Sequence, residues 1–126
     1  MEEKRPKPLP PTLRGKQRYI AYQIISEQKI PFSDLVNSIW HSLLNFLGER
    51  GTAEANIWIV KNTYEEDKQI GLLRCSHRMI EHVRSALALI QRIGDTKVVV
   101  KVLGVSGTMK AARKKFFGET DLKDFT

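Results

Sequence analysis

Residues 104–108 combine a serine with two glycines, residue types that build nucleophile and phosphate sites. A nucleophile elbow requires glycine two residues after its serine, but position 108 is threonine and no histidine follows Ser106. A Walker loop requires Gly-Lys, and although Lys110 is in place, position 109 is methionine. The segment therefore predicts a tight turn in which Ser106 or Thr108 caps a following helix. Phosphate contact with the N–H groups at that helix start is an equal alternative.

Cys75 and His77 are the residue types that bind zinc, but no second ligand pair stands at zinc spacing. His77 and His82 are five positions apart, so they diverge on a helix. Cys75 is predicted to be an inward-facing strand residue. We expect no metal or cofactor on the protein and no catalytic residue in it.

Basic side chains gather near both ends of the chain. Residues 1–18 hold six basic residues against two acidic ones, a net charge of +4, together with four prolines that favour an extended arm. In residues 108–117 the helical spacing places cations on one face, while Met109, Ala112 and Phe116 form another face that should dock the helix. Such point charges bind phosphate backbones, although a solvated surface is the plain alternative. The candidate RNA-binding residues are Arg14, Lys16, Arg18, Arg74, Lys101, Lys110, Arg113, Lys114 and Lys115.

Hydrophobic periodicity predicts the elements that position these cations. Alternation indicates strands, and apolar residues at three- and four-residue intervals indicate helices. Ser33 and Ser76 are the predicted N-caps of the two long helices; Gly48 and Gly51 should end the first, and Gly94 the second. The predicted elements are strand 19–26, a helix from 33, strands 55–61 and 69–75 around a turn at 62–68, a helix from 76, strand 97–103, a turn at 104–107 and helix 108–117.

This order predicts an α+β fold of the ferredoxin-like, RRM-like split βαβ–βαβ type, with two helices on one face of a four-stranded antiparallel sheet and a C-terminal basic helix. Residues 1–18 form the arm, 19–117 a single domain and 118–126 a flexible tail. Ile20, Tyr22 and Ile24 should face the core. The other face should carry Arg74 and Lys101, and its apolar residues are the expected partner interface unless the last helix covers them. Those apolar residues are Leu72, Val99 and Leu103.

Two ferredoxin-like function classes fail on their motifs. Acylphosphatases carry a glycine-rich phosphate loop after the first strand, but residues 27–31 contain no glycine. RNA-recognition motifs stack bases on aromatic residues of the third strand, and residues 69–75 contain none.

The composition is that of one globular domain. The 126 residues are 41% hydrophobic and 28% charged, with a formal net charge of +7, which is typical of a nucleic-acid binder. No apolar run approaches the roughly 18 residues of a membrane span, and the N-terminus has no apolar signal core. With a single cysteine, these features predict a cytoplasmic protein.

Several segments resemble the archaeal ribonuclease P protein component 2 family, the Pop-five family. They are Leu-Pro-Pro-Thr-Leu-Arg at 9–14 leading into 18–22, Ala-Leu-Ala-Leu-Ile at 86–90, and Leu-Gly-Val-Ser-Gly-Thr at 103–108 before a basic helix ending in Phe116 and Phe117. The resemblance covers about residues 9–117 and is most specific in its first and last segments.

The resemblance implies a subunit of an endoribonuclease that removes the 5′ leader from precursor tRNA, with catalysis by an RNA that uses Mg²⁺. It also implies as partners the ribonuclease P RNA, a barrel-shaped protein subunit, other ribonuclease P proteins and, indirectly, precursor tRNA. It implies a homodimer within a two-plus-two assembly and no membrane. The basic residues would neutralise RNA phosphates and lower the Mg²⁺ requirement. Two rival readings are a non-catalytic protein–protein adaptor and a ligand-binding regulatory domain, which would need a concave apolar pocket.

Overall fold

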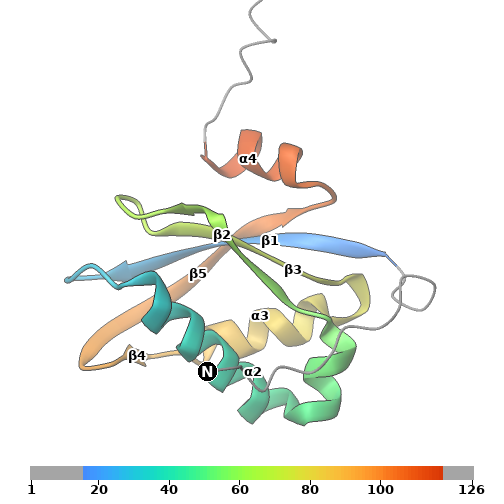
Figure 1. The fold of residues 1–126 in the computed structure, drawn as a ribbon, viewed down its shortest axis with the longest axis horizontal. Coiled ribbons are helices and arrows are strands. Elements are labelled where there is room, and N and C mark those ends of the chain that lie inside the picture. Colours follow the sequence, from blue (N-terminus) through green and yellow to red (C-terminus); the bar gives the residue numbers. More distant parts are fainter. Residues whose placement is uncertain (1–15, 118–126) are drawn as a thin grey trace, which may run out of the picture.

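A computed structural model describes residues 16–117, without the side chains of residues 62 and 63. The elements run in the order β1 (Gln17–Ser26), α2 (Phe32–Ala55), β2 (Trp58–Glu65), β3 (Ile70–Ser76), the 3-10 helix η1 (His77–Met79), α3 (Ile80–Ala88), β4 (Arg92–Ile93), β5 (Thr96–Ser106) and α4 (Met109–Phe117) (Figure 1). The predicted α+β class is confirmed.

The sheet has five strands in the order β2-β3-β1-β5-β4, and all neighbours are antiparallel. The prediction of four strands is wrong, because the chain after α3 pairs with β5. Arg92 lies opposite Lys97 and Ile93 opposite Thr96, which forms β4. This segment was predicted to be helix as far as Gly94, but α3 ends at Ala88.

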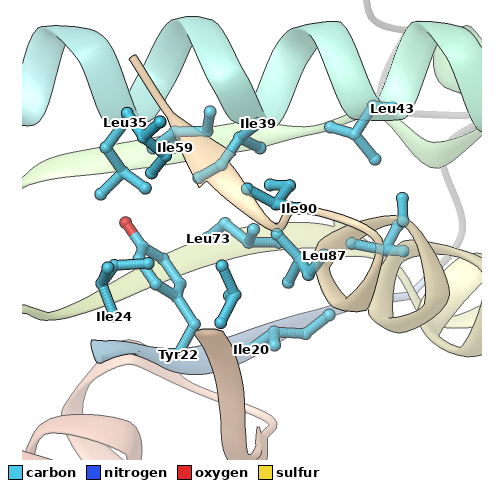
Figure 2. Packing of buried hydrophobic residues seen from close by; sticks show 14 of the residues in the cluster. Ile20, Tyr22, Ile24, Leu35, Ile39, Leu43, Ile59, Leu73, Leu87 and Ile90 are labelled. Carbon is cyan, nitrogen blue, oxygen red and sulfur yellow. The ribbon is translucent and has the colours of Figure 1, made fainter. Parts of the chain in front are cut away.

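Helices α2 and α3 lie on one face of the sheet and α4 lies on the other (Figure 1). Figure 2 shows Leu35 and Ile39 of α2 packed toward Tyr22 and Ile24 of β1. The predicted alternation of β1 is confirmed, since Ile20, Tyr22 and Ile24 are all in this main core. Burying these large side chains stabilises the helix layer by about 1.5–3 kcal/mol for each one.

Helix α2 continues past the glycines that were expected to end it. Gly48 has φ 73° and ψ 177°, a conformation open to glycine alone, and it kinks the helix instead of stopping it. Thr52 is buried behind the kink, and its hydroxyl donates hydrogen bonds to the carbonyl oxygens of Gly48 (2.7 Å) and Leu43 (3.3 Å). The helix therefore continues for about two more turns, to Ala55, before β2.

The predicted serine N-cap is wrong for the first helix, and for the second it is correct only in position. Pro31 occupies the N-cap of α2 and has no side-chain hydrogen bond, so Ser33 is already inside the helix. Ser76 occupies the N-cap of the 3-10 helix η1, which leads directly into α3, but its side chain makes no cap hydrogen bond. Packing of the apolar face, more than capping, defines where these helices begin.

Strand β5 extends through residues 104–106, where a turn was predicted. These residues pair with β1: Gly104 lies opposite Ala21, and Ser106 opposite Tyr19. The register shifts between Ala21 and Tyr22, so Leu103 is the extra residue of a β-bulge. Leu103 and Gly104 consequently both face α4.

Candidate nucleic-acid interface

Helix α4 is docked on the sheet by the face predicted from its sequence. Ala112 is fully buried, and Met109 and Phe116 pack around a second hydrophobic cluster. Phe117, which the spacing argument did not include, is buried there as well. The described members of this cluster are Ala21, Val60, Ile70, Leu72, Ala112 and Phe117, with Tyr19, Leu103, Met109 and Phe116 against them.

The cations of α4 lie on its solvent side. Lys110, Lys114 and Lys115 are exposed and Arg113 is half-buried. The ammonium nitrogen of Lys115 also lies 5.4 Å from the centre of the Phe116 ring. Docking thus fixes the helix by its apolar side and presents a dense positive surface, which attracts anions by its summed field.

The start of α4 is a capped helix N-terminus. The Thr108 hydroxyl accepts a hydrogen bond from the N–H of Ala111 (3.1 Å), and the Ser106 hydroxyl donates to the Thr108 carbonyl oxygen (3.3 Å). The capping prediction is confirmed for Thr108. Phosphate contact at this point stays a prediction.

Helix α4 divides the sheet face on which it lies. Arg74 lies opposite Tyr19 and Lys101 opposite Gln23, with Ala21 between them under the helix. Four residues along a strand span about 13 Å, so the two cations flank α4 on opposite sides. Both are on the predicted face, but they do not form one cluster.

The N-terminal cations separate in a similar way. Arg14 lies outside the described residues, and Lys16 is exposed just before β1. Arg18 lies opposite Cys75, which belongs to the main core. The Arg18 side chain therefore starts from the face covered by α2 and α3, and not from the face that carries α4. Its guanidinium donates to the carbonyl oxygen of Gln17 (2.9 Å).

The predicted partner interface is only partly at the surface. Leu72 has no exposed surface, because α4 and its cluster cover it, so it is not accessible to a partner in this structure. Leu103 is half-buried in the same cluster. Val99 is 60% exposed and lies opposite Ile25, itself 51% exposed, so these two form a small apolar patch beyond α4.

Sequence reasoning considered one aromatic residue of this face only as a possible part of an exposed patch and not as a stacking residue. Trp58, the first residue of β2, is 43% exposed, and the guanidinium carbon of Arg74 lies 4.6 Å from its ring centre. The search for stacking residues was confined to the third strand. The signal that could have found Trp58 is strand alternation, since its neighbour Ile59 belongs to the main core and Trp58 must then face the other side of the sheet.

Cys75 is buried in the main core, as predicted. This burial raises the pKa of its thiol to about 12, so it is neither a nucleophile nor a ready metal ligand at neutral pH. His41, His77 and His82 are all exposed and lie on separate turns. Within residues 16–117, no three His, Cys, Asp or Glu side chains group closely enough to hold a metal ion.

Comparison with known proteins finds a family model and relatives that match most of the chain. Residues 18–117 match the model of the Rpp14/Pop5 family. The chain is 44% identical over 115 residues to ribonuclease P protein component 2 of Pyrococcus furiosus, covering 91% of this chain and 94% of that one. It is 39% identical to the protein of the same name from Methanocaldococcus jannaschii, covering 89% and 81%.

A chain in the cryo-EM structure of yeast ribonuclease MRP has the same overall fold. The TM-score is 0.54 at 14% identity, and the superposition covers 74% of this chain and 75% of the yeast chain. Among the described residues, no helix is both long and apolar enough to cross a membrane.

Proposed function

We propose that this chain, which belongs to the Rpp14/Pop5 family, is a protein subunit of ribonuclease P, the endonuclease that removes the 5′ leader from precursor tRNA. Relatives named ribonuclease P protein component 2 align with it over nearly their whole length, which supports the same role here. The catalysis belongs to the RNA of the complex. This protein supports the RNA and supplies no catalytic group.

The two side chains that could act as nucleophiles, those of Ser106 and Cys75, fit a non-catalytic role. Ser106 is engaged with the helix start, and Cys75 is buried as a neutral thiol. The docked helix α4, with its cations outside and its apolar side inside, is the observation that carries the proposal. We assign to it the neutralisation of phosphates where RNA segments approach each other, so that less Mg²⁺ is required for the active RNA fold.

Several finer points are proposed with it. Mg²⁺ is bound by the RNA and not by this chain. The protein partners are a barrel-shaped subunit and other ribonuclease P proteins, and two copies of this chain assemble in a two-plus-two complex. Precursor tRNA is contacted indirectly. Val99 is the exposed member of the predicted partner surface.

The order β2-β3-β1-β5 of the long strands supports a ferredoxin-like sheet to which β4 is added. A cytoplasmic location rests on composition alone.

A salt titration of RNA binding tests the proposal against the adaptor reading. Affinity for ribonuclease P RNA should fall steeply with salt, and the slope should decrease by about one for each phosphate contact removed. Changing Lys110, Arg113, Lys114 and Lys115 to alanine should therefore weaken binding and flatten the slope.

The matched control removes four exposed cations elsewhere, at Lys29, Lys61, Lys68 and Arg84. All four lie outside α4, and Lys29, Lys68 and Arg84 form ion pairs with Asp67, Glu65 and Glu81 in that order. If α4 makes the phosphate contacts, the loss of these four cations should change the slope much less. An adaptor with incidental charge predicts no RNA binding. Equal slopes for both variants would contradict the role of α4.

A further inference from the structure

Four residues form a continuous row across the face of the sheet that carries α4. Trp58 of β2 lies opposite Arg74 of β3, Arg74 opposite Tyr19 of β1, and Tyr19 opposite Ser106 of β5. Directly paired residues point to the same face. The next row inward along the strands lies under α4, so this row is at the border of the helix, with Tyr19 half-buried against the α4 cluster.

The Trp58 and Arg74 side chains form a stacked pair that is open to solvent. Trp58 is 43% exposed, and the guanidinium carbon of Arg74 lies 4.6 Å from the ring centre. None of the ion pairs among the described residues includes Arg74, and its buried Nε has no acceptor among them. Among the described residues, the indole of Trp58 is therefore the contact of this cation, and the guanidinium retains hydrogen-bonding capacity for a ligand.

Further positive charge lies at the same end of the sheet. Because β1 and β3 are antiparallel, the start of β1 lies beside the end of β3, and His77 N–H donates to the carbonyl oxygen of Lys16 (3.0 Å). Lys16 and Arg78 are both exposed there. Helix α4, with its own cations, begins three residues after Ser106.

We propose that Trp58, Arg74 and Tyr19 form a binding site for an unpaired RNA base. This proposal rests on the function proposed above and specifies which part of the RNA this end of the sheet takes. A base presents a flat π-face, and it stacks on indole, phenol or guanidinium planes with little regard to its identity. The cations of α4 on one side of the row, and Lys16 and Arg78 at the same end of the sheet, would contact the phosphates that flank the stacked base. A duplex has no unpaired base to stack in this row.

The charge of the surroundings favours a nucleotide over an apolar protein partner. A protein aromatic residue could also stack on Trp58, but it would bring no negative charge for Arg74, Lys16 and Arg78. This site differs from the aromatic platform expected on the third strand of an RNA-recognition motif. Here the third strand supplies the arginine, and strands β1 and β2 supply the aromatic rings.

Tryptophan fluorescence of the full chain tests the proposal. The sequence has two tryptophans, so Trp40→Phe leaves Trp58 as the only tryptophan, whose emission is excited selectively over that of tyrosine at long excitation wavelength. Single-stranded hexauridylate should quench this emission. An abasic strand with the same number of phosphates should bind more weakly and should not quench.

Binding of Trp58→Ala supplies the second readout. The affinity for hexauridylate should fall about tenfold, whereas affinity for an RNA duplex should stay within about twofold. Trp58→Phe should retain most of the affinity, because a smaller ring still stacks. The matched control is Phe46→Ala, since Phe46 is an aromatic of similar exposure (46%) on α2, away from this face.

Equal binding and quenching by the abasic strand would overturn the stacking site, and so would an unchanged hexauridylate affinity in Trp58→Ala. If this happens while the α4 variant still flattens the salt slope, the proposed function stands and only the base site is wrong. If the wild-type chain binds no RNA at any salt concentration, both proposals are wrong.

Discussion

Cys75 shows how a single residue changes its chemistry through its position. The thiol lies in the main core beside β1, where the charged thiolate would lose its hydration. Burial therefore raises the pKa from an ordinary 9.0 to about 12. The residue type alone suggested a metal ligand, and the strand alternation correctly predicted a structural role.

This shift predicts a loss of stability at high pH. Above pH 9 the unfolded chain loses the thiol proton, whereas the folded chain retains it to about pH 12, so the free energy of unfolding falls as pH rises through that window. At about pH 10.5 the contribution is at most about 2 kcal/mol. Urea denaturation of wild type and Cys75→Ala at about pH 8 and about pH 10.5 checks it.

The difference between the two proteins isolates the contribution of the thiol from that of every other group in the chain. Wild type should lose more stability than Cys75→Ala. Parallel losses in both proteins would show that the thiol is not buried as described.

At the scale of elements, the attachment of α4 depends on one glycine. A Cβ at Gly104 would lie 2.5 Å from Cζ and 2.7 Å from Cε1 of Phe116. The ring would have to move, and the helix that carries it would lose part of its packing. Gly104→Ala should therefore destabilise the protein by about 1–3 kcal/mol, measured as a lower urea midpoint.

Gly107 provides the matched control for this change. A Cβ there meets nothing within 4 Å, and its φ is not positive, so Gly107→Ala should change stability by no more than about 0.5 kcal/mol. If the two substitutions have the same effect, α4 is not seated on Gly104 in solution.

The order of the long elements was predictable from the sequence, because buried strands and helices carry their period in the residues themselves. The docking face of α4 was predictable for the same reason. The bulge at Leu103, the strand β4 and the kink at Gly48 were not, since each depends on pairing or packing with distant residues.

The candidate site could likewise be predicted from the sequence only in part. Arg74 and Lys101 were assigned to the correct face, but only the docked helix separates them and covers Leu72. The stacking of Arg74 on Trp58 follows from the register between β2 and β3, which is irregular after Val60. Local periodicity does not determine such a register.

For the whole molecule, the two faces of the sheet have different roles. One face is filled by α2 and α3 and provides the stable core. The other is crossed by α4, so that a positive helix surface lies between the Trp58–Arg74 pair on one side and the Val99 patch on the other. The chain as a whole has a formal net charge of +7, and we propose that the face crossed by α4 is the one that binds RNA.

Reconstituted cleavage of precursor tRNA tests the central claim most directly. Ribonuclease P RNA and the partner proteins would be assayed over a range of Mg²⁺ concentrations, with this chain, without it, and with its variant in which Lys110, Arg113, Lys114 and Lys115 are alanine. We expect the wild-type chain to lower the Mg²⁺ concentration at half-maximal 5′-leader removal, and the variant to lose most of that effect. An identical Mg²⁺ dependence in all three mixtures would contradict the account.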